Sequence, residues 1–144
     1  MSAILTRSSH ASQPAPARAA GGSASGGVRA VLRLESAAAF VAAIALYGHA
    51  GFSWLALVIL FLAPDLSMLA YLAGPRAGAL AYNLVHNYAL ALPLALAGFA
   101  LGSPVASALA LILIAHIGFD RMLGYGLKYP SGFGDTHLGR IGRA

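Results

Sequence analysis

Four long apolar blocks constrain the fold of this chain more than any other feature of its sequence. They cover about 31–48, 52–72, 80–101 and 104–123, and each is close to the roughly 20 apolar residues that a helix needs to cross a bilayer. Only 9% of the residues are charged, whereas soluble domains carry about 25%. The pattern predicts an all-α polytopic membrane protein with four transmembrane helices.

The separators between the blocks are short and predict that the helices form two hairpins. A small polar turn around 49–53 joins the first two blocks, and Gly102-Ser103 joins the last two. Between the hairpins, Gly74-Pro75-Arg76 ends the second helix, because glycine and proline both favour termination. No block alternates apolar and polar residues over the length of a barrel strand, which argues against a transmembrane β-barrel.

The two ends of the chain differ in composition from the blocks. Residues 1–28 are rich in Ser, Ala, Gly and Pro and contain too little apolar material for a core, so we expect a disordered segment. This segment has arginines but no acidic residue, and a transit peptide stays an alternative for it. Residues 29–123 form the predicted transmembrane domain, and 124–144 a glycine-rich cytoplasmic tail that is ordered or interfacial.

The Lys and Arg residues predict the orientation, because short basic loops stay on the cytoplasmic side. Basic residues lie before the first block, at Arg76 and after the fourth block, and the other two loops contain none. We therefore expect an inner (plasma) membrane protein with both termini cytoplasmic. We interpret the net charge of +5 as a consequence of this topology and as a source of attraction to anionic lipid headgroups. The sequence has no basic patch interleaved with aromatic residues, so nothing in it indicates nucleic-acid binding.

Few strongly polar side chains interrupt the blocks, and a charged one at a helix centre costs about 2.5–3.5 kcal/mol on insertion scales. They are Glu35, Asp65, Asn83, His86, Asn87, His116 and Asp120. With a rise of about 1.5 Å per residue, Asp65 and His86 each lie roughly 10 Å from the cytoplasmic end of their helix. The other polar groups lie near the same end, so one polar layer is expected on the cytoplasmic side.

Helical phase turns this layer into a candidate site, because residues three and four apart share a face. Asn83, His86 and Asn87 fall on one stripe, and His116 and Asp120 fall on another. If both stripes face the aspartate of the second block, two imidazoles and two carboxylates converge. This set, without any cysteine in the chain, suits a divalent Zn, Mn or Fe ion.

These observations lead to specific assignments. The predicted metal ligands are Asp65, His86, His116 and Asp120. The two aspartates are also the predicted catalytic residues. The residues predicted to support the site are Asn83, Asn87, Asp135 and His137. The last two reach it only if the tail turns back at the glycine-rich stretch 132–134, and we expect His137 within about 11 Å, two helical turns, of His116 or Asp120.

Two classes of function are compatible with this site. In a metal-dependent hydrolase, the ion would polarise a phosphoryl or acyl oxygen of a lipid or small phosphoester and activate water. In a non-enzymatic protein, such as a carrier, a proton relay or a structural or interaction protein, the same side chains form an interhelical hydrogen-bond network. Membrane lipid is the expected partner in both, and with only four spans a homo-oligomer is plausible.

Further expectations concern single residues. Glu35 is expected to pair with Arg33 or Arg76. Arg121 is expected to extend its guanidinium to the membrane interface. Two prolines, Pro64 and Pro93, are expected to kink their helices.

Several strings in the chain resemble a bacterial family of small membrane proteins of unknown function. They are Ala63-Pro64-Asp65-Leu66-Ser67-Met68-Leu69, Tyr82-Asn83-Leu84-Val85-His86, His116-Ile117-Gly118-Phe119-Asp120-Arg121, Gly124-Tyr125-Gly126-Leu127-Lys128-Tyr129-Pro130 and Asp135-Thr136-His137-Leu138-Gly139. The resemblance spans about 32–141, and it implies the four-helix architecture but no activity.

The chain is also distantly similar to inner-membrane proteins described as metal-dependent hydrolases, which pair a Pro-Asp motif with later histidine motifs. Pro64-Asp65, His86, and His116 with Asp120 occur here in that order. Ser67 stands where that family tends to have a second aspartate, and the surroundings of His86 lack its Arg and Thr-His-Ser elements. The similarity implies a metal ion and a hydrolytic reaction.

Overall fold

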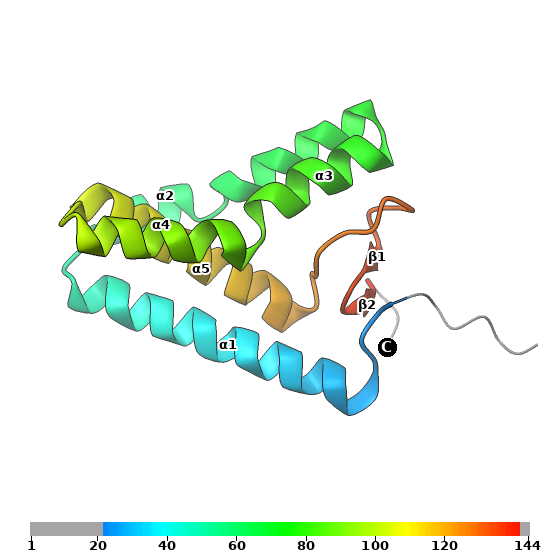
Figure 1. Ribbon diagram of the computed structural model, residues 1–144, viewed down its shortest axis with the longest axis horizontal. Helices are drawn as coiled ribbons and strands as arrows, with labels where there is room; N and C mark the ends of the chain where they lie inside the picture. Colours follow the sequence, from blue (N-terminus) through cyan, green and yellow to red (C-terminus); the bar gives the residue numbers. More distant parts are fainter. Residues whose placement is uncertain (1–21, 142–144) are drawn as a thin grey trace, which may run out of the picture.

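A computed structural model describes residues 22–141, and almost all of that range outside its C-terminal segment is helical (Figure 1). Four helical stretches are long and apolar enough to cross a membrane, and these are Gly26–His49, Trp54–Ala73, Pro75–Ala100 and Pro104–Leu123. The predicted all-α class with four spans is confirmed, and it indicates a multi-pass membrane protein. The predicted disorder of the N-terminal segment falls mostly on residues outside the described range.

The first and last spans are single helices, and each of the other two consists of two pieces. The elements are α1 (Gly26–His49), α2 (Trp54–Leu60), the 3-10 helix η1 (Ala63–Ala73), α3 (Pro75–Val85), α4 (Tyr88–Ala100), α5 (Pro104–Leu123), β1 (Asp135–Thr136) and β2 (Gly139–Arg140).

The second span is not the continuous helix that the sequence predicted. The α-helical part ends at Leu60 and η1 begins at Ala63, with Pro64 in its first turn. Because proline has no N–H, the α-helical ladder loses a donor at this point, and the chain continues with tighter 3-10 geometry. The predicted kink at Pro64 is thus a full break, and Asp65 stands in the first turn after it.

The third span differs from the prediction in the same way. It begins at Pro75 rather than near residue 80, and it is interrupted at His86 and Asn87, between α3 and α4. The Asn87 amide joins the two pieces: its Oδ1 accepts from the N–H of Leu90 (3.0 Å), and its Nδ2 donates to the carbonyl of Leu84 (2.8 Å). Backbone groups released by the break are therefore satisfied inside the protein, as a low-dielectric surrounding requires.

The helices pack in pairs, with α5 at the centre. The most extensive contacts join α1 to α5, α4 to α5 and η1 to α3, and the pair of α3 and η1 diverges from α1 in Figure 1. Glycines permit the closest approaches: a Cβ added to Gly118 of α5 would lie 2.8 Å from the backbone of α1, and one added to Gly98 of α4 would lie 2.6 Å from a backbone nitrogen of α5. Small residues at helix contacts are typical of membrane proteins.

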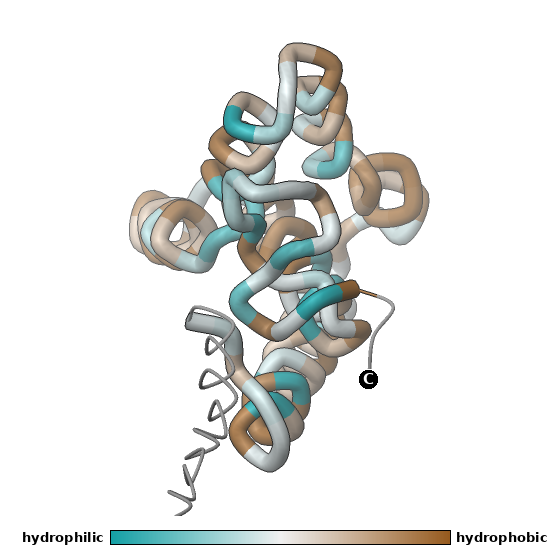
Figure 2. The backbone as a smooth tube through the Cα atoms, turned by 90° about the vertical axis from the view of Figure 1, so that its right-hand side faces the viewer, coloured by the Kyte–Doolittle hydropathy of each residue, from teal (hydrophilic) through white to brown (hydrophobic). Residues whose placement is uncertain are grey.

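Most of the apolar surface faces outward. Many large hydrophobic side chains are exposed, such as Leu72 (90%) and Leu101 (82%). The buried core is a small cluster around Tyr47, Leu111 and Ile112. In Figure 2 hydrophobic positions lie on the outward turns of the helices, and hydrophilic ones gather at the end that carries the C-terminal segment. Lipid would cover this surface, which in water would be an aggregation hazard.

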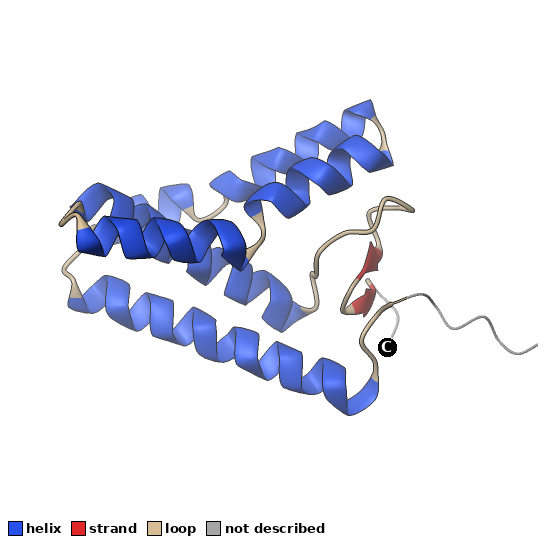
Figure 3. Ribbon diagram, in the orientation of Figure 1, coloured by secondary structure: helices blue, strands red, loops and turns tan. Residues whose placement is uncertain are grey.

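The C-terminal segment is ordered and contains the two short strands of the described chain (Figure 3). The strands β1 and β2 pair antiparallel, and Thr136 also forms a bridge with Lys128. The segment is tied to the beginning of α1, because the N–H of Ala24 donates to the carbonyl of His137 (2.7 Å). The tail is thus a folded cap on the basic end of the bundle.

Candidate metal centre

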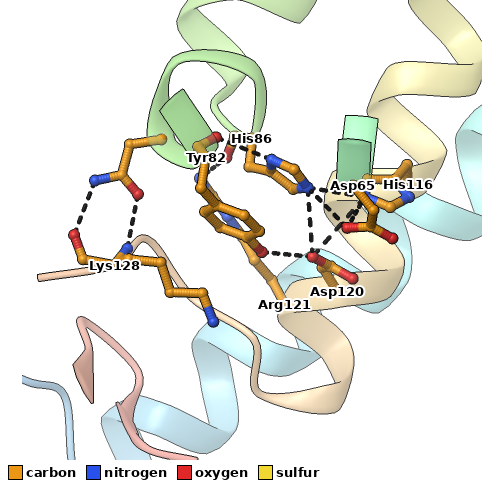
Figure 4. A network of polar contacts seen from close by, with 8 residues as sticks. Asp65, Tyr82, His86, His116, Asp120, Arg121 and Lys128 are labelled. Carbon is orange, nitrogen blue, oxygen red and sulfur yellow. Dashed lines mark hydrogen bonds and ion pairs between the residues drawn. The ribbon is translucent and has the colours of Figure 1, made fainter. Parts of the chain in front are cut away.

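The four predicted metal ligands come together from three different elements (Figure 4). Asp65 follows the break before η1, His86 ends α3, and His116 and Asp120 stand one turn apart on α5. Each residue offers one ligand atom, and the four atoms lie within 4.8 Å of one another. Both histidines are buried, with 2% and 1% of their side chains exposed, and the carboxylates are partly accessible.

The separations of the ligand atoms match what a small divalent ion requires. His86 Nε2 lies 3.0 Å from His116 Nε2, and Asp65 Oδ1 lies 3.3 Å and 3.5 Å from these two nitrogens. Asp120 Oδ2 is more distant, at 3.8 Å and 3.9 Å. Four ligands held at about 2.0–2.2 Å around a tetrahedral ion lie roughly 3.3–3.6 Å apart, so the group could hold a metal ion with only small adjustments.

The hydrogen-bond partners of the two imidazoles determine the tautomer of His86 but not that of His116. His86 Nδ1 faces the carbonyl of Tyr82 at 2.9 Å, and because a carbonyl only accepts, Nδ1 carries the hydrogen and a neutral His86 presents a lone pair at Nε2. His116 Nε2 and the two carboxylate oxygens face the same point. His116 Nδ1 is buried without a hydrogen-bond partner, so either nitrogen of a neutral His116 can carry its hydrogen. In the described chain, the only basic groups at ion-pair distance from Asp65 and Asp120 are these two histidines. With both carboxylates ionised and both imidazoles neutral, the group would carry a charge of −2, which a divalent cation would balance.

Tyr82 holds this arrangement in place, and the sequence analysis missed it. Its hydroxyl donates to Asp120 Oδ2 (2.6 Å), its carbonyl orients His86, and its ring stacks on the His86 ring with centroids 3.6 Å apart. Hydrogen bonds from neighbouring groups that fix the orientation of metal ligands are typical of metal sites. The available signal was spacing, since Tyr82 precedes His86 by one helical turn.

Residues 29–141 match a protein family described as domain of unknown function (DUF4260). The chain belongs to this family. The match begins and ends close to the limits of the resemblance noted in the sequence, and all four candidate ligands lie within it. No curated protein and no solved structure matches the chain, and the similarity to metal-dependent hydrolases therefore stays a prediction.

The candidate site of this DUF4260 member forms one wall of a half-open cavity of about 300 Å³. Asp65, Tyr82 and Asp120 line it together with Lys128 and Phe133 from the C-terminal segment. Lys128 is 3% exposed, and its ammonium lies over the rings of Phe133 (4.1 Å to the centroid) and Tyr82 (4.9 Å). In the sequence this lysine was only one of the basic residues after the fourth block, and it was not predicted to belong to the site.

Burial lowers the pKa of Lys128 from 10.5 to about 8, although the charges of Asp120 and Asp65 act in the opposite direction. Burying the charged ammonium therefore destabilises the folded state by its full amount below about pH 8. The destabilisation decreases between pH 8 and 10.5 and is absent above 10.5, where the amine is neutral in both states. The shift corresponds to at most roughly 3 kcal/mol, and the net cost is smaller because solvent in the half-open cavity screens the charge and cation–π contacts offset part of it.

We expect Lys128→Met to stabilise the chelator-treated protein by about 1–2 kcal/mol at pH 7. The gain should disappear above pH 10.5, because the wild-type amine is then neutral in both states. Thermal unfolding in detergent at the two pH values measures it. A variant that is less stable than the wild type at pH 7 would show that the aromatic contacts outweigh the cost of burying the charge.

Three of the residues predicted to support the site form hydrogen bonds or ion pairs elsewhere and do not contact the ligand atoms. The Asn83 amide binds Lys128 on both sides, accepting from its N–H (2.7 Å) and donating to its carbonyl (2.9 Å), and Asn87 joins the two helices at the break. Asp135 accepts from Ser131 and pairs with Arg140 in the hairpin. None of these three belongs to the group of ligand atoms.

The other tail residue, His137, faces inward within the C-terminal segment. Its Nδ1 accepts from the N–H of Leu127 (2.8 Å). Burial and the nearby guanidinium of Arg121 lower the pKa of His137, which favours the neutral ring that this bond requires. Its predicted distance from His116 or Asp120 stays a prediction.

Two expectations about charged side chains are wrong. Within residues 22–141 no ion pair joins Glu35 to an arginine, and Arg33 donates instead to the carbonyl of Met122 (2.8 Å). Arg121 does not extend to the interface. Its guanidinium lies over the Tyr88 ring (4.6 Å) and donates to the carbonyl of His86 (3.3 Å), which the break leaves free.

Proposed function

We propose that this protein is a membrane-embedded hydrolase that uses one divalent Zn, Mn or Fe ion and acts on a phosphoester or ester of a lipid or small molecule. The observation that carries this proposal is the convergence of four ligand atoms, two of them from carboxylates that line a half-open cavity. A purely structural hydrogen-bond network would not need a cavity beside these atoms.

The residues have distinct roles in this proposal. His86, His116 and Asp65 form the tighter triangle of ligand atoms and would hold the ion. The ion would supply Lewis acidity toward a phosphoryl or carbonyl oxygen. Asp120, the most distant of the four, accepts the Tyr82 hydroxyl and is placed either to complete the ligand set or to take a proton from water in the cavity.

The site lies at the end of the bundle that carries the basic tail, and the distribution of Lys and Arg predicts that this end faces the cytoplasm. Asp65 and Asp120 are partly accessible, whereas the two imidazoles are buried. A substrate would therefore approach the carboxylate side, from the cytoplasm or from the adjoining lipid leaflet. Water for hydrolysis is available from the same side.

Elemental analysis of protein purified in detergent without chelator tests the proposal. We expect about one equivalent of a transition metal per chain. Hydrolysis of a chromogenic phosphate ester or acyl ester should be lost after treatment with a chelator and restored by adding the metal back. The Asp120→Asn variant should retain its fold and lose at least about 100-fold in rate, because general acid–base groups typically contribute 10²–10⁴-fold.

A metal content near zero, with His86 and His116 both required for stability, would favour the non-enzymatic network instead. Stoichiometric metal without hydrolysis of either class of ester would leave a metal site and exclude the hydrolase. Each outcome separates the two classes of function that the sequence left open.

A further inference from the structure

We propose that the cavity beside the candidate metal centre binds a phosphate group, and that the Lys128 ammonium is the residue that recognises it. This inference rests on the proposed function and narrows its substrate class to phosphoesters. The cavity is lined by Asp65 and Asp120 together with the lysine and Phe133. A group seated between them would contact both the ion and the ammonium.

Among residues 22–141 the ammonium has no anionic partner of its own. No carboxylate of the described chain lies at ion-pair distance from Lys128 Nζ, and its neighbours are the faces of Tyr82, Phe133 and Tyr125. Aromatic faces stabilise the positive charge but do not satisfy all three N–H donors. A side chain that is 3% exposed and lines a cavity with unsatisfied donors is suited to an anionic ligand.

The backbone around Lys128 holds the ammonium in position. The Asn83 amide binds both its N–H and its carbonyl, and the residue bridges antiparallel to Thr136. The next residue, Tyr129, donates its N–H to the carbonyl of Asp135 (2.8 Å). A lysine on a flexible tail would lose much conformational entropy on binding, whereas this one is already ordered.

The charges also explain why the metal and the phosphate would bind together. Without a cation, Asp65 and Asp120 would repel an anion from the cavity that they line, and a divalent ion would cancel that repulsion. A tetrahedral phosphate has enough oxygens to meet both the ion and the ammonium. The cavity of about 300 Å³ is roughly ten times the volume of one water molecule, which leaves room for part of the group esterified to the phosphate.

The experiment is isothermal titration of inorganic phosphate into metal-loaded protein in dodecyl maltoside, which contains no phosphate. We expect saturable binding that weakens about tenfold or more in Lys128→Gln and is largely retained in Lys128→Arg, which keeps the charge. Arg140→Gln is the matched control, because it removes one positive charge from an exposed side chain. Its affinity for phosphate should equal that of the wild type.

A second arm identifies the source of the phosphate. With the protein in nanodiscs, phosphatidic acid should compete with inorganic phosphate if a lipid headgroup enters the cavity, and glycerol 3-phosphate should compete if a soluble ester does. Competition by phosphatidic acid or by glycerol 3-phosphate supports the proposal, provided that the competing compound binds more weakly to Lys128→Gln than to the wild type. Metal content and circular dichroism of the variant show whether its fold is retained, and a misfolded Lys128→Gln is replaced by Lys128→Met.

The outcomes separate this inference from the proposed hydrolase. Stoichiometric metal with no phosphate binding, or with equal binding by wild type and a folded Lys128→Gln, would overturn the phosphate site and leave the metal centre standing. A protein without metal that still binds phosphate through Lys128 would support recognition by the lysine, but it would overturn both the hydrolase and the joint binding of metal and phosphate. Absence of both metal and phosphate would overturn both proposals.

Discussion

Alanine in place of His86 or His116 is expected to abolish stoichiometric metal binding. Both imidazoles are buried, and their Nε2 atoms lie only 3.0 Å apart at the point where the two carboxylate oxygens also converge. Within residues 22–141 no other His, Asp or Glu side chain joins this group, so a lost imidazole cannot be replaced by a ligand of the same kind. Even residues that merely orient ligands typically contribute 10–100-fold to metal affinity, and we expect a loss of more than about 100-fold for either ligand.

Elemental analysis and competition with a chromogenic chelator measure this loss. His49→Ala is the matched control, because that histidine is exposed at the end of α1 and its removal should leave the metal content unchanged. Retention of a full equivalent of metal by folded His86→Ala or His116→Ala would show that the four residues are not the ligand set. Helical content before and after chelation distinguishes a lost ligand from a lost fold.

Leucine in place of Gly118 is expected to separate α1 from α5 and to destabilise the protein by about 3 kcal/mol or more. A Cβ at this position would lie 2.8 Å from both the backbone nitrogen of Phe40 and the carbonyl oxygen of Ser36. These are backbone atoms of a long helix and cannot move aside as a flexible side chain could. Overpacking of a core typically costs about 1–3 kcal/mol and occasionally more.

Thermal unfolding in detergent measures the effect, and Gly118→Ala should show a smaller loss. Because Gly118 lies between His116 and Asp120 on α5, Gly118→Leu should also lower the metal content. Gly27→Ala is the control, since nothing lies within 4 Å of a Cβ added there in α1, and it should be neutral or slightly stabilising. A fully stable Gly118→Leu would mean that the contact between α1 and α5 is looser than described.

Much of the architecture could be predicted because hydrophobicity and helix periodicity act locally. Four apolar blocks of sufficient length require four spans, and polar residues in the blocks are costly enough that they gather in one place. Asp65, His86, His116 and Asp120 could therefore be selected as a group from depth and phase alone.

What the sequence alone determined about this protein is its class, its spans and the identity of the polar group, because each depends on the properties of one segment at a time. Only the tertiary structure decided how the group is assembled. The breaks before Asp65 and at His86 release backbone groups that distant partners satisfy, such as Arg121 donating to the His86 carbonyl. Lys128 reaches the cavity because Asn83, 45 residues earlier, binds its backbone. Such pairings depend on how the pieces pack, and no local pattern of residues encodes them.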